Sequence, residues 1–347
     1  MTNKQTNKQT NKQTNKQTNK QTNKQTNKQT NKQTNKQTNK QTNKQTNKQT
    51  NKQTNKQTNK QTNKQTNKQT NKQTNKQTNK TVAVVTSTIG RDELVRAIES
   101  VKAQTYPCRH YIFVDGEQFS DKAKGLVEPY QDLVITYLPM NTGKNGMVNS
   151  GVNAIASFLV EEDIICYLDD DNWYKPNHVE ELVKVLDRGA DFAYSLRDLY
   201  SLNGQFICSD DWESLGYWKL NKPVKLNIIY ADKTYPLVFN FSNQECHIDT
   251  NTYAFPRTLA IELSRSWYSG IYNDRHVYKK LQELGKVGVG SAKYTVNYSA
   301  DLEKMIKIQG DEELASLLAQ PGVREALIKK LCEVNIEYHG NQKPWSG

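Results

Sequence analysis

Four short apolar runs alternate with helical patterns in the first half of this chain, and they constrain its fold more than any other feature. The runs cover residues 82–86, 111–114, 133–138 and 164–168. Each is too short for a helix, ends in a polar loop and precedes apolar residues at helical spacing. Strands that alternate with helices in this way indicate βαβ units and a parallel sheet, so the fold class is predicted to be α/β.

The fourth run carries the strongest functional signal, because it ends in three consecutive carboxylates, Asp169, Asp170 and Asp171. Three acids at the end of a buried strand repel one another and destabilise the fold unless a cation lies among them. A divalent metal that bridges carboxylates to the phosphates of a ligand would supply that cation. Ligands of open α/β sheets bind at this end of the strands. The alternative is a solvated acidic turn that caps the next helix.

Polar side chains from the other loops should meet these acids. Right-handed crossovers bring the carboxyl ends of the parallel strands to one edge of the sheet. The polar residues expected there are Thr86, Arg91, Asp115 and Lys144. Convergence from four separate loops favours a ligand site over a solvated turn.

Residues 2–80 consist of an uninterrupted TNKQ repeat. The repeat contains no apolar side chain, Gly or Pro, so it cannot bury the surface that would offset the entropy of ordering, and it is predicted to be disordered. It holds 20 lysines; subtracting these 20 charges from the formal net charge of +12 leaves −8 for residues 81–347. An acidic folded part argues against a specific nucleic-acid partner. The lysines could hold an anionic partner weakly, although a spacer role is expected.

The cysteines and the hydropathy pattern indicate a cytoplasmic protein. Five cysteines are scattered at positions 108, 166, 208, 246 and 332, which is typical of a reduced chain and not of a disulfide framework or a zinc site. No signal-peptide pattern is present. The longest apolar stretch, near 154–160, is too short to span a bilayer, so no transmembrane segment is predicted. Peripheral attachment at the inner membrane face stays open.

The second half of the chain changes character. Residues 190–256 are rich in aromatic and β-branched side chains, which predicts mixed, partly antiparallel strands with long loops. Two helices are expected at about 258–267 and 274–284, and a strand at 287–296. A helical pattern then runs over 311–334 with a break at Pro321-Gly322.

Four motifs resemble those of the family 2 glycosyltransferases of the GT-A fold. They are VAVVTSTIGRDELVRAIESVKAQTY, FVDG, the loop around Lys144 and YLDDDN, in that order and at familiar spacing. The resemblance implies a Rossmann-like βαβ nucleotide-binding half and a mixed-sheet acceptor half. The predicted domains are then a disordered tail over 1–80, a GT-A domain over 81–300 and a helical extension over 301–347.

The resemblance also implies ligands and site residues. A nucleotide-sugar donor, with UDP as the usual nucleotide, and a divalent Mn²⁺ or Mg²⁺ are expected. Thr86 and Arg91 fall where the first loop meets the nucleotide, and Asp115 falls where a carboxylate accepts a hydrogen bond from the base. Lys144 and Asn149 lie in the loop and helix that face the nucleotide.

The acids at the fourth strand and at a later helix take the remaining roles. Asp169 and Asp171 form the Asp-x-Asp pair of the family: the second should ligate the metal, and the first should hold the ribose or a metal-bound water. Asp170, between them, is counted among the donor contacts. Asp274 is the candidate general base, preceded by Asn273 where the family often has an acid.

The polar stretch His247, Asp249 and Asn251 lies between apolar runs and is predicted to line the acceptor side. His247 could alternatively be a core histidine. The sequence thus predicts an inverting, metal-assisted glycosyltransferase that acts on a hydroxyl of a saccharide, lipid or protein. A non-catalytic nucleotide- or sugar-binding protein, with the repeat as an interaction arm, stays open. A sugar nucleotidyltransferase is disfavoured, because the loop 87–91 has one Gly and one Arg where those enzymes carry a Gly-rich basic loop.

Overall fold

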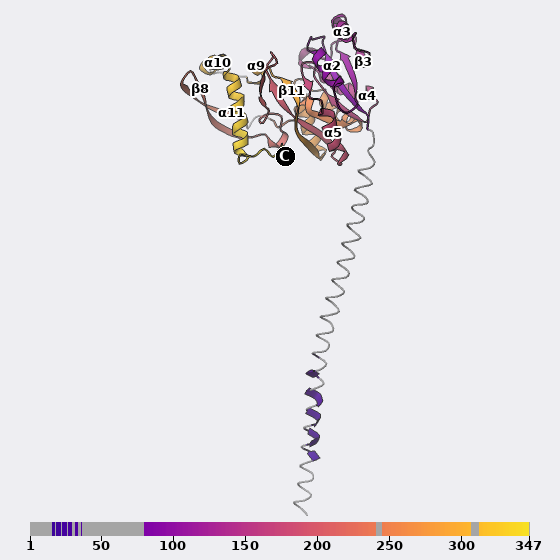
Figure 1. The fold of residues 1–347 in the computed structure, drawn as a ribbon, viewed down its shortest axis with the longest axis vertical. Helices are drawn as coiled ribbons and strands as arrows, with labels where there is room; N and C mark the ends of the chain where they lie inside the picture. The colour runs from indigo at the N-terminus through magenta and orange to yellow at the C-terminus, as the bar shows by residue number, and fades with distance from the viewer. Residues whose placement is uncertain are drawn as a thin grey trace, which may run out of the picture. The chain divides into compact units, whose positions relative to one another are not determined.

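The computed structural model describes residues 80–240, 245–306 and 312–346, together with scattered residues between 16 and 36. The chain divides into two compact units, Met1–Asn79 and Lys80–Gly347. Figure 1 shows the second unit, which carries the site and all the elements named below. The described residues of the repeat between 16 and 36 are exposed, and Lys80 is half-buried. Most of the predicted disordered tail lies outside the described residues.

A mixed sheet of nine strands organises the second unit in the part of the chain that the structure describes. Its order is β3-β2-β1-β4-β10-β6-β11-β5, with β7 paired to β6. The strands are β1 (Val82–Thr88), β2 (Arg109–Val114), β3 (Leu133–Tyr137), β4 (Ile164–Tyr167), β5 (Trp173–Tyr174), β6 (Phe192–Tyr200), β7 (Phe206–Ser209), β10 (Tyr253–Pro256) and β11 (Gly288–Ser299). β1 to β4 are parallel, whereas β10 runs antiparallel to β4 and β6. This confirms the parallel first half and the mixed second half.

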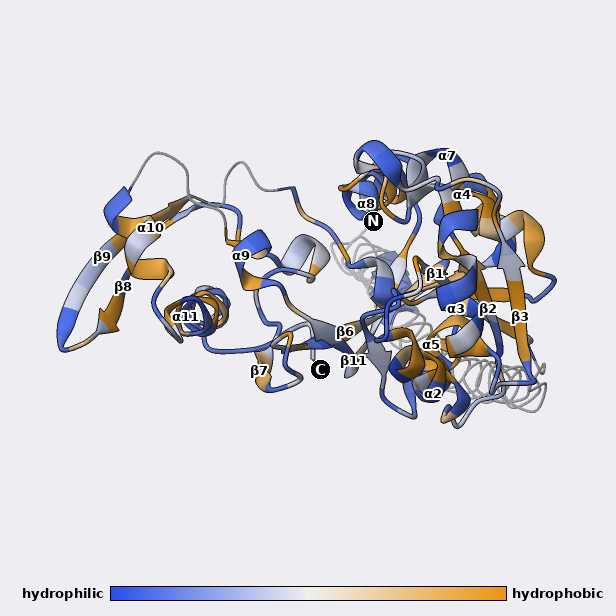
Figure 2. Ribbon diagram, turned by 90° about the horizontal axis from the view of Figure 1, so that it is seen from above, coloured by the Kyte–Doolittle hydropathy of each residue, from blue (hydrophilic) through white to orange (hydrophobic). Residues whose placement is uncertain are grey.

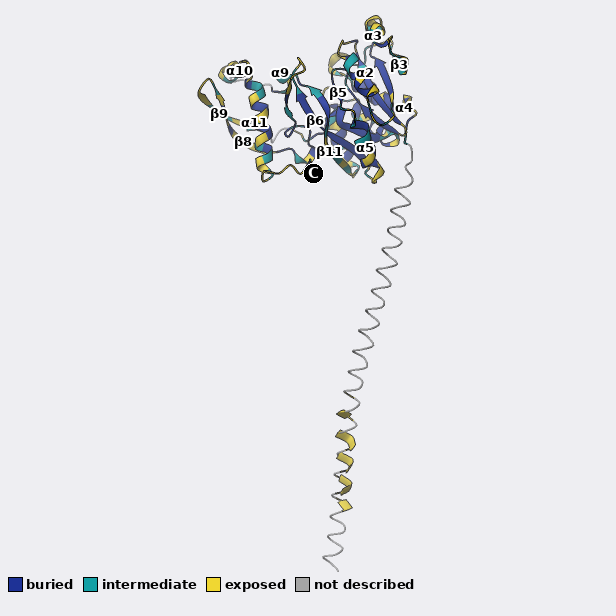
Figure 3. Cartoon of the chain, viewed as in Figure 1, coloured by how far each residue is buried: buried dark blue, intermediate teal, exposed yellow. Residues whose placement is uncertain are grey.

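Helices cover both faces of the sheet, so that its central strands are buried (Figures 2 and 3). One face carries α2 (Leu94–Lys102), α3 (Ser120–Val127) and α5 (His178–Asp187). The other carries α4 (Ser150–Leu159), α6 (Arg257–Glu262), α7 (Ser264–Trp267) and α8 (Asn273–Glu283). No helix among the described residues has the length and apolarity needed to cross a bilayer. The five cysteines are all free.

Helix α4 follows the apolar spacing of its sequence only in part, because that spacing predicts one buried face with Val152, Ile155 and Leu159. Val152 is buried as expected, but Ile155 and Leu159 are 37% and 50% exposed. The buried side of the helix also uses small residues, among them Gly151 and Ala156, which allow α6 and α7 to pack closely. The spacing of apolar residues alone therefore identifies the buried face of α4 only in part.

The C-terminal helices belong to the same compact unit as the large sheet. They are α9 (Leu302–Met305), α10 (Glu312–Leu318) and α11 (Val323–Tyr338), with the predicted break before α11. They share a core with the hairpin of β8 (Pro223–Tyr230) and β9 (Lys233–Asn240). The end of the chain is fixed to the larger fold, because Asp211 accepts hydrogen bonds from Lys343 Nζ and Trp345 Nε1, each at 2.7 Å.

Candidate active site

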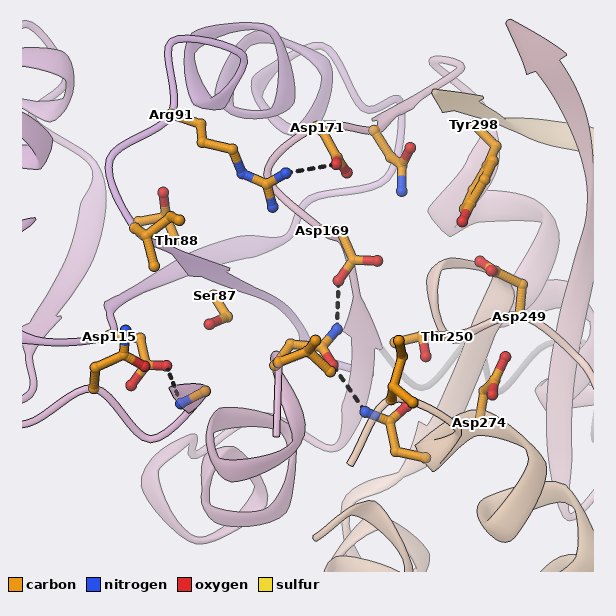
Figure 4. A pocket seen from close by; sticks show the side chains of 18 residues that line it. Ser87, Thr88, Arg91, Asp115, Asp169, Asp171, Asp249, Thr250, Asp274 and Tyr298 are labelled. Atoms are coloured by element: carbon orange, nitrogen blue, oxygen red, sulfur yellow. Dashed lines mark hydrogen bonds and ion pairs between the residues drawn. The ribbon is translucent and has the colours of Figure 1, made fainter. Parts of the chain in front are cut away.

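A pocket of about 500 Å³ opens at the carboxyl ends of the parallel strands. The loops after β1, β2 and β4 line one side, and η4 (Thr250–Thr252), the start of α8 and the end of β11 line the other (Figure 4). The polar and aromatic side chains that line it include Arg91, Asp115, Asn149, Asp169, Asp171, Asp249, Asn273, Asp274 and Tyr298. The predicted convergence of strand-end loops is therefore present, and the second half of the chain completes the enclosure.

The three consecutive acids do not all face the pocket. Asp169 and Asp171 line it, whereas Asp170 is fully buried. Asp170 accepts a hydrogen bond from Thr88 Oγ1 at 2.6 Å and forms an ion pair with Arg91 at 2.6 Å. The predicted donor contact of Asp170 is thus corrected to a supporting role beneath the loop.

Arg91 supplies positive charge to the acidic loop. Its guanidinium bridges Asp170 and Asp171, which lies at 2.8 Å, and 46% of its side chain stays exposed. Burial lowers the pKa of Arg91, but the nearby carboxylates outweigh burial and raise it. Arg91 therefore stays charged and faces the pocket where the sequence predicted a nucleotide contact.

Asp169 is held by two asparagine side chains. Asn149 Nδ2 donates to Oδ1 at 2.6 Å, and Asn251 Nδ2 donates to Oδ2 at 2.9 Å. Burial, followed by the charges of Asp171 and Asp249, raises the pKa of Asp169 to about 7. Asn251, predicted on the acceptor side, is fully buried and supports Asp169 from below.

Asp115 holds the loop that follows β3. It accepts hydrogen bonds from the backbone nitrogens of Thr142 and Gly143 at 2.7 and 2.9 Å, and from Thr142 Oγ1 at 2.9 Å. A Cβ on Gly143 would lie 2.3 Å from Val148 O, so the loop closes on itself only with glycine there. Val148 has a φ of 45°, which is uncommon for a β-branched residue and occurs here beside the pocket. The contact of Asp115 with a nucleotide base stays a prediction.

Two residues predicted to meet the nucleotide do not line the pocket. Thr86 is fully buried, and its Oγ1 lies 2.9 Å from His110 Nε2. The next residues of β1, Ser87 and Thr88, reach the pocket in its place. Lys144 begins η2 (Lys144–Gly146) and is exposed to solvent away from the pocket lining. These positions do not support the predicted contacts of Thr86 and Lys144.

A buried arginine organises the acceptor side. Arg197, on β6, pairs with Asp249 through Nη1 at 2.7 Å, and its guanidinium lies 4.2 Å from the ring of Tyr298. Both partners line the pocket. Neither Arg197 nor Tyr298 was predicted from the sequence. The available signal was the charged pair Arg197-Asp198 within the otherwise mostly apolar run Phe192–Tyr200, because arginine is rarely buried without partners.

Asp274 lies in the first turn of α8 and points into the pocket (Figure 4). Burial, followed by the charge of Asp249, raises the pKa of Asp274 to about 7. His247 Nε2 is 3.6 Å from its carboxylate. Burial, with the charges of Lys219 and Arg275, lowers the pKa of His247 well below its usual value, so the imidazole is neutral. His247 is buried behind Asp274 and does not line the acceptor side as predicted.

Lys219 is a buried cation next to this group. It is 4% exposed, its Nζ makes no hydrogen bond to the described residues, and burial lowers its pKa. We expect Lys219→Met to raise the free energy of unfolding at pH 7 by about 1–3 kcal/mol, because an unsatisfied polar group leaves the interior. Thermal unfolding should show this as a rise of the melting temperature, by about 2–4 °C for each kcal/mol in a unit of this size.

The same substitution at Lys225, which is exposed on β8, is the control and should leave the melting temperature unchanged. The advantage of Lys219→Met should shrink as pH rises towards the usual pKa of lysine, because the unfolded wild type then loses the proton that its folded state already binds weakly. A lower melting temperature for Lys219→Met at pH 7 would contradict this assignment.

The acids meet the requirements of a metal only in part. Among the described residues, no group of three or more His, Cys, Asp or Glu side chains is arranged to hold a metal ion. Asp169 and Asp171 provide two carboxylates at one wall of the pocket. Mg²⁺ is commonly bound by one or two carboxylates together with the phosphates of a substrate, so this donor set fits a metal that arrives with a phosphorylated ligand.

The chain is similar to known proteins in sequence and in structure. The family model described as "Glycosyl transferase family 2" matches residues 81–244. An uncharacterized protein of Haemophilus influenzae is 33% identical over 132 residues, which are 38% of this chain and 88% of that protein.

Among solved structures, S. aureus TarS 1-349 in complex with UDP is similar, with 13% identity, a TM-score of 0.42, and coverage of 76% of this chain and 72% of that one. S. aureus TarS 1-349 in complex with UDP-GlcNAc is similar with 14% identity and a TM-score of 0.42, and the match covers 74% of this chain and 66% of that one. The match to the family model, the order of motifs and the arrangement of parallel and mixed strands lead to one assignment. The chain belongs to the family 2 glycosyltransferases and has their GT-A fold.

Proposed function

We propose that this glycosyltransferase moves a sugar from a nucleoside-diphosphate donor, in the first instance a UDP-sugar, to an acceptor hydroxyl with inversion at the anomeric carbon. One observation carries the proposal: a single pocket holds Asp169 and Asp171 on one wall and Asp274 on the other. A donor and an acceptor that bind between these walls would place the reacting carbon between a diphosphate site and a base. Membership of the family supports the class of donor.

The donor wall is suited to a diphosphate. Arg91 offers a permanent positive charge beside Asp171, and Asp169 and Asp171 would hold Mn²⁺ or Mg²⁺. When bound, the metal would neutralise charge on the departing diphosphate. The guanidinium would add a donor of fixed geometry that matches phosphate oxygens. Both charges favour departure of the nucleotide from the sugar.

The acceptor wall is suited to proton removal. The acceptor oxygen bonds to the anomeric carbon as the bond from that carbon to the diphosphate oxygen breaks, and the hydroxyl proton passes to the carboxylate of Asp274. A pKa of about 7 lets Asp274 accept a proton near neutral pH. Because attack and departure occur on opposite faces of the sugar, one displacement inverts the configuration.

Titration calorimetry with UDP tests the donor wall. Wild-type protein should bind UDP more tightly with Mn²⁺ than with EDTA, and Asp171→Ala should lose at least about tenfold of this metal-dependent affinity, because changes around a metal ligand typically cost that much. Asp132→Ala removes an exposed carboxylate outside this pocket and should bind as wild type does. Equal binding by wild type and Asp171→Ala, or binding that ignores Mn²⁺, would contradict the proposal.

A further inference from the structure

The residue before the candidate base is an asparagine with a defined partner. Asn273 is 3% exposed, and its Nδ2 donates to Asn149 Oδ1 at 2.8 Å. Asn149 in turn donates from Nδ2 to Asp169 Oδ1 at 2.6 Å. The dashed lines in Figure 4 trace this path across the pocket, from the start of α8 to the acid at the end of β4.

The direction of this path is set by its neighbours. Asn273 Nδ2 also lies 3.2 Å from Ser150 Oγ, which donates its own proton to Gly270 O at 3.0 Å and therefore accepts from Asn273. Asp169, when ionised, can only accept hydrogen bonds. The amide groups of Asn149 and Asn273 must consequently both point their nitrogens towards Asp169, one after the other.

Asn251 fixes the other side of the same carboxylate. Its Nδ2 donates to Asp169 Oδ2 and to Asp249 Oδ1, both at 2.9 Å, and its Oδ1 accepts from the backbone nitrogen of Asp169 at 2.6 Å. Each carboxylate oxygen of Asp169 therefore accepts a hydrogen bond from an asparagine side chain. Asn251 is oriented by Asp249 and by the backbone nitrogen of Asp169, whereas the orientation of Asn149 depends on the side chain of Asn273.

We propose that Asn273 is a positioning residue that sets the carboxylate of Asp169 through the carboxamide of Asn149, and that this site requires an amide and not an acid at position 273. The consequence for donor binding rests on the function proposed above. The side chain of an ionised aspartate at 273 has no hydrogen to donate, so Asn149 would turn its NH₂ towards it. Asn149 Oδ1 would then face Asp169 Oδ1, and two acceptors would meet without a proton between them.

The same contact ties the donor wall to the candidate base. Asn273 and Asp274 are consecutive in the first turn of α8. The path through Asn149 therefore fixes the start of this helix against Asp169 in a pocket that already holds Asp249.

Asn273→Asp is the sharpest test because it keeps the size of the side chain. In ligand-free protein, the side-chain amide NMR signals of Asn149 should shift in this variant, because its carboxamide turns over. In calorimetry with UDP and Mn²⁺, Asn273→Asp should bind at least about tenfold more weakly, the loss typical when support of a metal-binding carboxylate fails.

A double-mutant cycle separates positioning from general stability. If Asn273 acts through Asn149, then Asn149→Ala combined with Asn273→Ala should bind UDP and Mn²⁺ no more weakly than Asn149→Ala alone. Asn145→Asp adds a negative charge at an exposed position of the neighbouring loop and serves as the matched control, with affinity and Asn149 signals unchanged.

Three results would overturn the inference: unchanged Asn149 signals in Asn273→Asp, wild-type affinity in that variant, or losses that add in the double variant. Absence of UDP binding by the wild type would instead contradict the proposed donor. The amide signals would still decide whether the path exists, because they are recorded without a ligand.

Discussion

Replacing Asp274 with Asn should lower kcat for sugar transfer by about 10²- to 10⁴-fold, the usual contribution of a positioned base. The substitution keeps the size of the side chain and removes its ability to accept the hydroxyl proton. Initial rates with a competent donor and acceptor measure the effect. The donor KM should change little, because the donor acids Asp169 and Asp171 lie on the opposite wall of the pocket.

The pH dependence provides a second readout of the same group. Burial and the charge of Asp249 raise the pKa of Asp274 to about 7, so the carboxylate forms only as pH rises through that value. Wild-type kcat/KM should therefore increase with pH up to about 7 and level off above it, while the residual activity of Asp274→Asn should lack this rise.

A stability control excludes trivial loss of structure. The folded-state pKa of Asp274 lies above its unfolded value, so ionisation of this group destabilises the fold increasingly as pH rises from the unfolded pKa to the folded one. Asp274→Asn should consequently melt at pH 8 no lower than wild type. If Asp274→Asn keeps wild-type turnover and Asp249→Asn loses it, the base is Asp249, the other acid on this wall.

Most of the donor half of the site could be predicted because its signals are local, although Thr86 and Lys144 do not line the pocket. Short apolar runs gave β1 to β4 nearly to the residue, and parallel strands bring their carboxyl ends together whatever else the chain does. Arg91, Asp115, Asp169 and Asp171 follow those strands directly, and all four line the pocket. The role of Asp170 was predicted wrongly, because its burial is apparent only from its hydrogen bond with Thr88, which lies 82 positions earlier in the chain.

The acceptor half could not be predicted in the same way. Asn273 meets Asn149 across 124 positions, and Asn251 meets Asp169 across 82. No periodicity or motif links such partners, and an asparagine in isolation is as suited to a turn as to a buried hydrogen bond. His247 illustrates the limit: a polar stretch between apolar runs predicts a place at the pocket, with the core as the alternative, and the structure places His247 in the core.

Replacing Arg197 should destabilise the fold far more than the loss of an exposed charge. Its Nε, Nη1 and Nη2 each form an ion pair at 2.7 Å, with Asp210, Asp249 and Glu213 respectively. Burial lowers the pKa of Arg197, but these carboxylates outweigh burial and raise it well above its usual value. Arg197→Met would leave three neighbouring acids without their cation, and breaking such a buried network typically costs about 3–5 kcal/mol.

Chemical denaturation measures this cost, with Arg109→Met as the control. Arg109 is 53% exposed and lies 3.9 Å from Glu162, so its loss should change the free energy of unfolding by less than about 1 kcal/mol. Arg197→Lys keeps the charge but cannot direct three donors along fixed axes, and its stability should fall between those of wild type and Arg197→Met.

A second acid substitution decides whether charge is the cause. Asp249→Asn removes one of the three carboxylates that Arg197 neutralises, so Arg197→Met combined with Asp249→Asn should be more stable than the sum of the two single effects predicts. Strictly additive losses would mean that Arg197 contributes through packing, including its contact with Tyr298, and not through its charge. Non-additivity would show that the wall carrying Asp249 is held in place by the cation behind it.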